Sequence, residues 1–297
     1  MILFPNYLCN PPAVWHGVNG NSMKGLVWSL VFSSFLGGYR LLDGFVKPGS
    51  KKGDPKKAVS KFDWQPLNYD NSKLYIYLSF DDGPQHGTVT CFDLVKQEQV
   101  KASFFMVGMH AAQKSDGKKI VAEIREAYPE ILLANHSYTH ASNKYRAFYH
   151  HPEMAEMDFL RAQDSLRVPY KISRLPGNRC WVRNGEIKAT GLVKPVAHLL
   201  DSLGYNVIGW DVEWHFNPKT ARPVQSAEKM AAEVDSAFAR NDTHVPNHLV
   251  ILSHDRMFQH PDEADSLAKF IRILKRNPRY VFETVDHYPG LKRPGRG

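Results

Sequence analysis

Cysteine is scarce in this chain, and several other class-defining features are missing. The 297 residues contain three cysteines, Cys9, Cys91 and Cys180, and an odd, sparse set is not the framework of a disulfide-stapled domain. No internal repeat recurs along the sequence, which excludes a solenoid. No arginine-rich stretch carries interleaved aromatic residues, so the sequence does not indicate nucleic-acid recognition.

Acidic residues are fewer than basic ones, 30 against 38, which gives a formal net charge of +8. Part of the excess is local, because residues 269–297 hold eight lysines and arginines against Glu283 and Asp286. Such a tail favours anionic polymers or membrane surfaces, although a solvated basic face is the commoner meaning. The length and the 43% hydrophobic content suit one large α/β domain or two small ones.

Long apolar runs are also few. Residues 25–37 form an uncharged one close behind Met23, which is an alternative start. The run resembles a signal peptide with a short n-region, and it is too short to span a membrane unless it extends further. We therefore expect an N-terminal segment over 1–44, with a signal peptide or membrane anchor at 25–42. This predicts a periplasmic, secreted or membrane-anchored protein of the cell envelope; the alternative is a buried helix in a cytoplasmic protein.

Composition divides the rest of the chain into three parts. Residues 45–72 are rich in Lys, Gly, Pro and Ser and predict a linker. Residues 73–287 alternate apolar runs with helical patterns, and 288–297 form a basic tail. The alternation predicts a parallel sheet with helices outside it, either a closed or nearly closed barrel or a doubly wound open sheet. Strands are expected near 73–79, 101–107, 130–135, 171–175, 205–210, 248–253 and 280–285, and helices near 88–98, 118–128, 152–167, 195–203, 225–240 and 262–276.

One strand end carries the strongest chemical signal. Asp81 and Asp82 follow the apolar run 73–79 and precede a Gly-Pro break. Neighbouring carboxylates at a strand end point in different directions, so one can hold a cation while the other accepts a proton. The alternative is an ordinary turn, because Asp-Gly-Pro is common turn chemistry.

Polar residues also stand where other predicted strands end. They are His136, His140, Arg174, Asp211 and His254. In parallel barrels the catalytic residues gather at the carboxyl ends of the strands, so we expect these side chains to meet.

The two histidines have the spacing of metal ligands. At i and i+4, His136 and His140 share one face if the segment turns helically. With one carboxylate they make a set of two His and one Asp, which leaves positions open for water and substrate. Zn²⁺ suits these ligands best, with Co²⁺ or Ni²⁺ as substitutes.

Five short motifs follow one another along the chain: Ser79–Pro84, His136–His140, Arg174–Asn178, Asp211–Trp214 and Leu252–His254. Taken together and in this order, they resemble the motifs of the polysaccharide deacetylases, the NodB-homology family known as carbohydrate esterase family 4. The resemblance covers about residues 73–287. It implies a single catalytic domain with a distorted (β/α)7 barrel and a metal in its mouth.

The resemblance implies roles for the first three motifs. Asp82, His136 and His140 would be the metal ligands. Asp81 would be the general base that activates water, and Arg174 would hold it in place.

The last two motifs would supply the acid. His254 would protonate the departing amine, and a carboxylate of the fourth motif would orient it. Asp211 and Glu213 compete for this part because the fourth motif is one residue shorter than the common spacing. Asp211 is favoured because it directly follows a predicted strand.

The third motif departs from the family pattern where substrate would bind. Gly177, after Pro176, occupies the position where the family often has an aromatic residue, so it keeps the backbone N–H expected at the oxyanion but loses the wall of the cleft. Trp181 is a candidate replacement surface, and Trp214 would line the leaving-group or acetyl pocket; a core position is the alternative for both. Glu213 is a further candidate for substrate contact.

The implied reaction is metal-dependent hydrolysis of N-acetyl amides (or O-acetyl esters) on a glycan, with release of acetate. The enzyme would act on carbon–nitrogen bonds other than peptide bonds, with an acetylated glycan as its partner. One alternative is a hydrolase of the same fold that acts on a non-sugar amide such as a cyclic ureide. The other is a non-catalytic glycan-binding module, which would normally have lost the ligands or the base that are intact here.

Overall fold

The computed structural model describes residues 60–113 and 115–293. By its internal contacts the chain divides into two units, Met1–Lys56 and Lys57–Gly297, and every described residue lies in the second. The predicted signal or anchor segment 25–42 and residues 45–59 of the predicted linker therefore lie outside the described residues. No helix in the described part is both long and apolar enough to cross a membrane.

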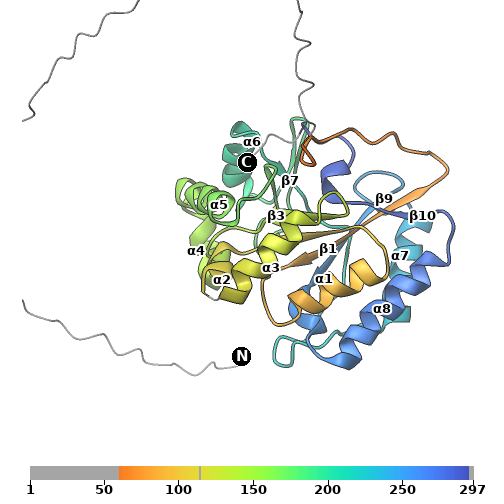
Figure 1. Ribbon diagram of the computed structural model, residues 1–297. Helices are drawn as coiled ribbons and strands as arrows, with labels where there is room; N and C mark the ends of the chain where they lie inside the picture. Colours follow the sequence, from red (N-terminus) through yellow and green to blue (C-terminus); the bar gives the residue numbers. More distant parts are fainter. Residues whose placement is uncertain (1–59, 114, 294–297) are drawn as a thin grey trace, which may run out of the picture. The chain divides into compact units, whose positions relative to one another are not determined.

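A mixed, mostly parallel sheet forms the centre of this unit (Figure 1). Its order is β6-β5-β7-β4-β3-β2-β1-β9-β8, and β10 pairs with β1 beside that path. The strands are β1 (Leu74–Asp81), β2 (Ala102–Met106), β3 (Ile131–Asn135), β4 (Ile172–Ser173), β5 (Trp181–Arg183), β6 (Glu186–Lys188), β7 (Asn206–Val207), β8 (Val212–Glu213), β9 (His248–His254) and β10 (Tyr280–Phe282).

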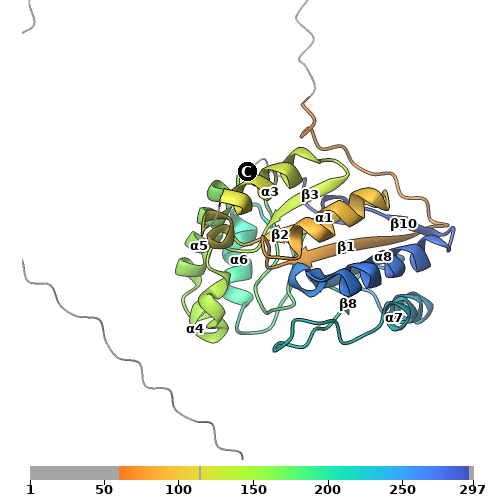
Figure 2. The same ribbon diagram turned by 60° about the horizontal axis from the view of Figure 1, so that its bottom comes forward.

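Helices cover the sheet between successive strands. α1 and α8 pack against each other beside β1, and α4, α5 and α6 gather at the opposite end of the sheet from α7 (Figures 1 and 2). The helices are α1 (Thr88–Gln97), α2 (Gly108–Gln113), α3 (Ser115–Glu126), α4 (Tyr145–Tyr149), α5 (Pro152–Leu166), α6 (Lys194–Ser202), α7 (Ala227–Ala239) and α8 (Pro261–Lys275), with short 3-10 turns at His140–Asn143, Asp255–Phe258 and Val285–His287.

Strand β1 organises the sheet. It pairs in parallel with β9 along Tyr75–Asp81, and its other edge pairs with β10 at one end and β2 at the other. All eight residues of β1 are buried, as expected of a parallel strand that is covered on both faces. The path ends at β6 and β8, which do not pair with each other among the described residues, so the sheet is curled but open. The predicted distorted (β/α) barrel is confirmed in this curled form.

Alternation along β1 separates two apolar cores. The even-numbered residues from 76 to 80 join the cluster beneath the helices. Tyr75 and Tyr77 join a second cluster within the curl of the sheet. Because side chains alternate with a period of two along a strand, Ser79 and Asp81 face the same interior side as the two tyrosines. The strand thus places the carboxylate of Asp81 on the inner side of the sheet, at the carboxyl end of β1.

The packed unit extends beyond the predicted limits 73 and 287. Within the predicted linker, Trp64 donates from Nε1 to the carbonyl of Asp286 at 3.1 Å, and Phe62, Leu67 and Tyr69 also pack on the interior cluster. Beyond 287, Tyr288 is 2% exposed. The Lys and Gly content of residues 45–72 predicted a linker, but the aromatic residues within this stretch pack on the core of the domain.

Candidate active site

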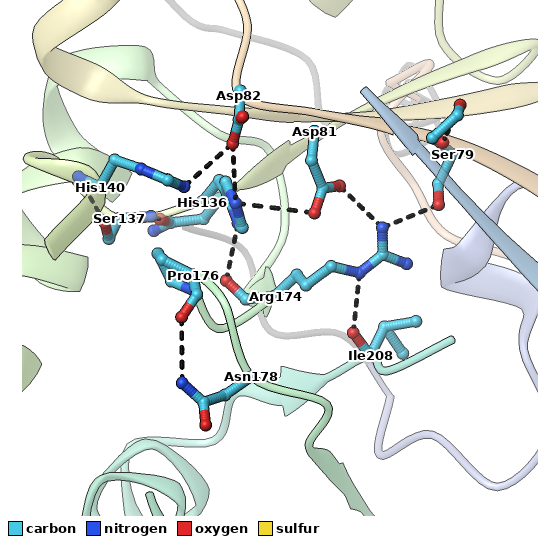
Figure 3. Close-up of polar contacts among 12 residues, drawn as sticks. Ser79, Asp81, Asp82, His136, Ser137, His140, Arg174, Pro176, Asn178 and Ile208 are labelled. Atoms are coloured by element: carbon cyan, nitrogen blue, oxygen red, sulfur yellow. Dashed lines mark hydrogen bonds and ion pairs between the residues drawn. The ribbon is translucent and has the colours of Figure 1, made fainter. Parts of the chain in front are cut away.

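The two consecutive aspartates meet at one place instead of diverging. Asp81 ends β1 and is buried, and Asp82 follows with φ of 75°. This left-handed backbone breaks the alternation of the strand, so both carboxylates reach the same imidazole. The Nε2 atom of His136 lies 3.6 Å from Asp81 Oδ2 and 3.4 Å from Asp82 Oδ1 (Figure 3).

Hydrogen bonds orient both imidazoles of the second motif. His136 follows β3, and its Nδ1 lies 3.0 Å from the carbonyl of Arg174. Because a carbonyl only accepts, Nδ1 must carry the proton, which leaves the Nε2 lone pair free. The Nδ1 of His140 lies 3.2 Å from Asn143 Oδ1, so its Nε2 also faces Asp82, at 3.0 Å.

Asp82, His136 and His140 have the donors and the spacing of a metal site. Their ligand atoms lie within 4.8 Å of one another. Two ligands held tetrahedrally at about 2.1 Å from Zn²⁺ would be roughly 3.4 Å apart, close to the separations here. Asp82 Oδ1 is buried and has no conventional hydrogen bond among the described residues. The residues present therefore fit a divalent cation.

The same convergence perturbs the ionisation of the triad. Burial opposes the charged form of Asp82, but the facing imidazoles of His136 and His140 outweigh it and hold its pKa well below the usual range. Burial likewise opposes the charged form of His140, and its contacts with Asp82 outweigh that effect and raise its pKa. A charged Asp82 is the form that a cation would need.

Arg174 fixes Asp81 from the interior of the fold. Its side chain is fully buried, and Nη1 donates to Asp81 Oδ1 at 2.7 Å and to Ser79 Oγ at 2.8 Å (Figure 3). The remaining nitrogens donate to the carbonyls of Ile208 and Gly209 at 3.1 Å each. A guanidinium of which every nitrogen donates a hydrogen bond holds the carboxylate in a single position.

His254 reaches the site from the neighbouring strand. It ends β9 and is the register partner of Asp81. Its Nδ1 is buried and has no hydrogen-bond partner among the described residues. The ring of Phe216 packs against the imidazole, with centroids 4.9 Å apart. His254 is therefore positioned by apolar packing.

The prediction that Asp211 or Glu213 orients His254 is wrong. Asp211 accepts from the backbone N–H groups of His244 and Val250, at 2.8 Å each. Val250 lies four residues before His254 on β9, about 13 Å away along a strand. Glu213 instead lies 3.3 Å from the Nδ1 of His215. The register between β8 and β9 keeps both carboxylates away from the imidazole.

Two further predicted site residues belong to the core. Trp181 is 1% exposed and stacks on His244 with centroids 4.3 Å apart. Trp214 is fully buried, and its Nε1 donates to the carbonyl of Gln225 at 2.9 Å. The prediction that these two tryptophans line the substrate cleft is therefore wrong, and the core alternative is correct for both.

The turn at Pro176 and Gly177 does lie beside the triad. Asn178 donates its backbone N–H to the carbonyl of Leu175 at 3.3 Å, which closes a turn with Gly177 at φ of 63°. Such a turn needs a positive φ at its third position, and glycine adopts it without strain. The backbone N–H of Gly177 donates to no other described residue, so it is free for a substrate oxygen.

Some residues of the site carry no signal in the sequence. His110 lies on α2, and its Nδ1 donates to the carbonyl of Asp82 at 2.7 Å, which supports the unusual backbone there. Asp255, directly after His254, is fully buried and bonds to Thr88, and burial raises its pKa to about 8. Only folding brings such pairs together, because 28 and 167 residues separate them.

A cleft of about 740 Å³ opens beside the triad. Asp82 and His140 form one part of its wall, and His86, His110 and Arg256 line the rest. A second cavity of the same volume lies between α1 and α3 and contains none of the site residues. The polar cleft beside the triad can therefore bring a substrate to it.

Together these observations define a class: a curled α/β barrel whose acid and histidine side chains meet at the carboxyl ends of its parallel strands. Residues 68–173 match the sequence profile of the polysaccharide deacetylase family. Over this region, which includes Asp81, Asp82, His136 and His140, the chain is similar to that family.

Individual relatives extend the similarity beyond residues 68–173. The chain is 28% identical to a peptidoglycan-N-acetylglucosamine deacetylase of Bacillus cereus, over 79% of this chain and 78% of that protein. It is 24% identical to a chitin disaccharide deacetylase of Vibrio alginolyticus, over 73% of this chain and 72% of that protein. A carbohydrate esterase family 4 esterase of Streptococcus mutans shares the fold, with a TM-score of 0.53 and 24% identity over 71% of this chain and 86% of that chain.

Proposed function

We propose that this protein is a metal-dependent hydrolase that removes acetyl groups from N-acetylated glycans and releases acetate. One observation carries the proposal: a two-histidine, one-aspartate donor set lies next to a separate aspartate that a buried arginine holds. The names of the relatives, which include deacetylases of chitin disaccharide and of peptidoglycan, support a glycan as substrate.

Asp82, His136 and His140 would hold one divalent cation, and their nitrogen and oxygen donors suit Zn²⁺, with Co²⁺ or Ni²⁺ as substitutes. When bound, such a cation polarises a carbonyl and lowers the pKa of a water molecule towards roughly 7. The Nδ1 hydrogen bonds of the two imidazoles keep both Nε2 atoms available for it.

Asp81 would accept a proton from the attacking water. Its Oδ1 is engaged by Arg174, while its Oδ2 faces the triad across 3.6 Å to His136 Nε2. A base must lie within hydrogen-bond reach of the proton it takes, directly or through one water. The free oxygen of Asp81 fits that requirement.

The remaining groups would serve the acetyl oxygen and the leaving group. The free backbone N–H of Gly177 would donate to the oxygen that becomes negative as water attacks. His254 would then protonate the amide nitrogen as the carbon–nitrogen bond breaks, because an unprotonated amine is a poor leaving group. One water is consumed, and acetate and a free amino sugar are formed in equal amounts.

The proposed location is the cell envelope or the medium, with 25–42 as signal or anchor. It rests on the apolar run of the sequence alone. When cells that express the tagged full-length chain are fractionated, we expect to find the protein outside the cytoplasm.

A substrate panel tests the function. Purified protein supplied with Zn²⁺ should release acetate from at least one of N-acetylated chitooligosaccharides, peptidoglycan and acetylated xylan. Equal molar amounts of acetate and new amine identify amide hydrolysis, whereas acetate without amine identifies an ester. Ring opening of a cyclic ureide without acetate release from any glycan would contradict the proposal.

A further inference from the structure

Helix α4 stands over the turn where the sequence lacks an aromatic residue. We propose that Tyr145, the first residue of α4, is a specificity-determining residue whose ring packs against the sugar that carries the scissile acetyl group. The inference rests on the proposed function, because it names the part of the site that would recognise the glycan.

Gly177 leaves the space that the Tyr145 ring fills. A Cβ atom placed on Gly177 would lie 3.1 Å from two carbons of that ring, Cδ1 and Cε1. This is closer than an ordinary contact, so any larger residue would push the ring away. The Tyr145 ring therefore occupies its position because residue 177 has no side chain.

Helix α4 is fixed to this turn at two points. Tyr149 is buried, and its hydroxyl donates to the carbonyl of Pro176 at 2.8 Å. Tyr145 and Tyr149 are four residues apart, so they lie on the same face of the helix. Both side chains therefore reach the turn, and the Tyr145 ring is held in place before any substrate arrives.

Tyr145 also touches the metal-ligand side of the site. Its ring meets the His140 imidazole edge-on, with centroids 5.7 Å apart and planes at 88°. Its hydroxyl lies 3.4 Å from Asn143 Oδ1, the atom that orients His140.

The ring is half-buried, so part of it stays open for a ligand. His140 and Asn143, which both contact it, line the cleft of about 740 Å³. A rigid aromatic ring at the edge of a polar cleft offers apolar area at little entropic cost, which suits the C–H face of a pyranose. An acetylated sugar held at His140 would therefore have this ring beside it.

Kinetic constants on two substrates test the role. The variants are Tyr145→Ala, Tyr145→Leu and Tyr145→Phe, measured on an N-acetylated chitooligosaccharide and on 4-nitrophenyl acetate, which has no sugar. For Tyr145→Ala we expect about a tenfold fall in kcat/KM on the glycan, carried mainly by KM, and a clearly smaller fall on the ester. Tyr145→Leu should resemble Tyr145→Ala, and Tyr145→Phe should stay within about twofold of wild type because the ring is kept.

Phe148→Ala is the matched control, because it truncates a ring on the same helix that packs on Tyr149. It should leave kcat/KM on both substrates near wild type. Equal losses on glycan and ester, or a Tyr145→Phe variant as weak as Tyr145→Ala, would overturn the inference. A wild-type protein that cleaves the ester but releases acetate from no glycan would overturn the proposed function, and the inference with it.

Discussion

The two proposed acid–base groups of the site, Asp81 and His254, are held in opposite ways. Asp81 is fixed by charge, through an arginine that is itself fully buried and donates four hydrogen bonds. The Nδ1 of His254, its register partner on the next strand, has no hydrogen-bond partner among the described residues, and the imidazole rests against the ring of Phe216. In the proposed mechanism, an ion pair thus holds the base in one position, whereas no hydrogen bond to Nδ1 fixes the acid among the described residues.

Breaking the ion pair between Arg174 and Asp81 should have the largest effect on stability and turnover. Arg174→Met removes the partner of a buried carboxylate and leaves four acceptors unpaired, which typically costs about 3–5 kcal/mol. We expect a fall of that size in the free energy of unfolding, measured by denaturant titration, together with loss of turnover. A variant of wild-type stability would show that the ion pair does not stabilise the fold.

Separating the two aspartates should distinguish their roles. Asp81→Asn should retain bound metal and lower turnover by about 10²–10⁴-fold, the usual contribution of a general base. Asp82→Asn should lower metal content, because it removes the charged ligand. Metal analysis and acetate release on both variants check this, and the reverse pattern would exchange the two assignments.

Replacing His254, the group held by apolar packing, should lower turnover by an amount that depends on the substrate. His254→Ala should lower turnover on an amide by about 10²-fold or more, because the amine must be protonated to leave. An activated acetate ester needs no such proton and should lose much less. Comparable losses on the two substrates would instead make His254 a binding or structural residue.

Of these substitutions, replacing Asp211 should have the smallest effect on catalysis. Since it bonds to the backbone of His244 and Val250 and not to His254, Asp211→Asn should leave kcat within about twofold of wild type. A large loss, with the fold intact, would mean that Asp211 does reach the acid during turnover.

The same variant should change how stability depends on pH. Burial raises the pKa of Asp211 from its ordinary value of 3.8 to about 6. Between these values the folded state keeps a proton that the unfolded state has lost, so this group makes stability fall as pH rises from about 4 to 6. Relative to Asp211→Asn, wild type should lose free energy of unfolding across that window and show no further relative change above it.

Much of the fold was predictable because its long elements have clear periods. The strands at 74–81 and 248–254 and the helices at 152–166 and 261–275 all lie close to their predicted ranges. The missed elements are short: α2, α4, β8 and the strands of the β5–β6 hairpin have two to six residues each. Segments of that length contain too few residues to show a period.

The candidate site shows the same division. Asp82, His136 and His140 come together as the spacing predicts. What failed depended on contacts far along the chain: the register of β8 against β9 separates Asp211 from His254, and tertiary packing buries Trp181 and Trp214. Tyr145 escaped notice because nothing in its local sequence says that α4 lies over Gly177.

The most direct test measures acetate release as a function of metal. Wild-type protein and His140→Ala are treated with a chelator, dialysed, and assayed on an N-acetylated chitooligosaccharide before and after addition of Zn²⁺ or Co²⁺. We predict that chelated wild type is inactive and recovers with about one metal per chain, as one triad requires, and that His140→Ala neither binds the metal nor recovers. Full acetate release by the chelated, metal-free wild type would contradict the account.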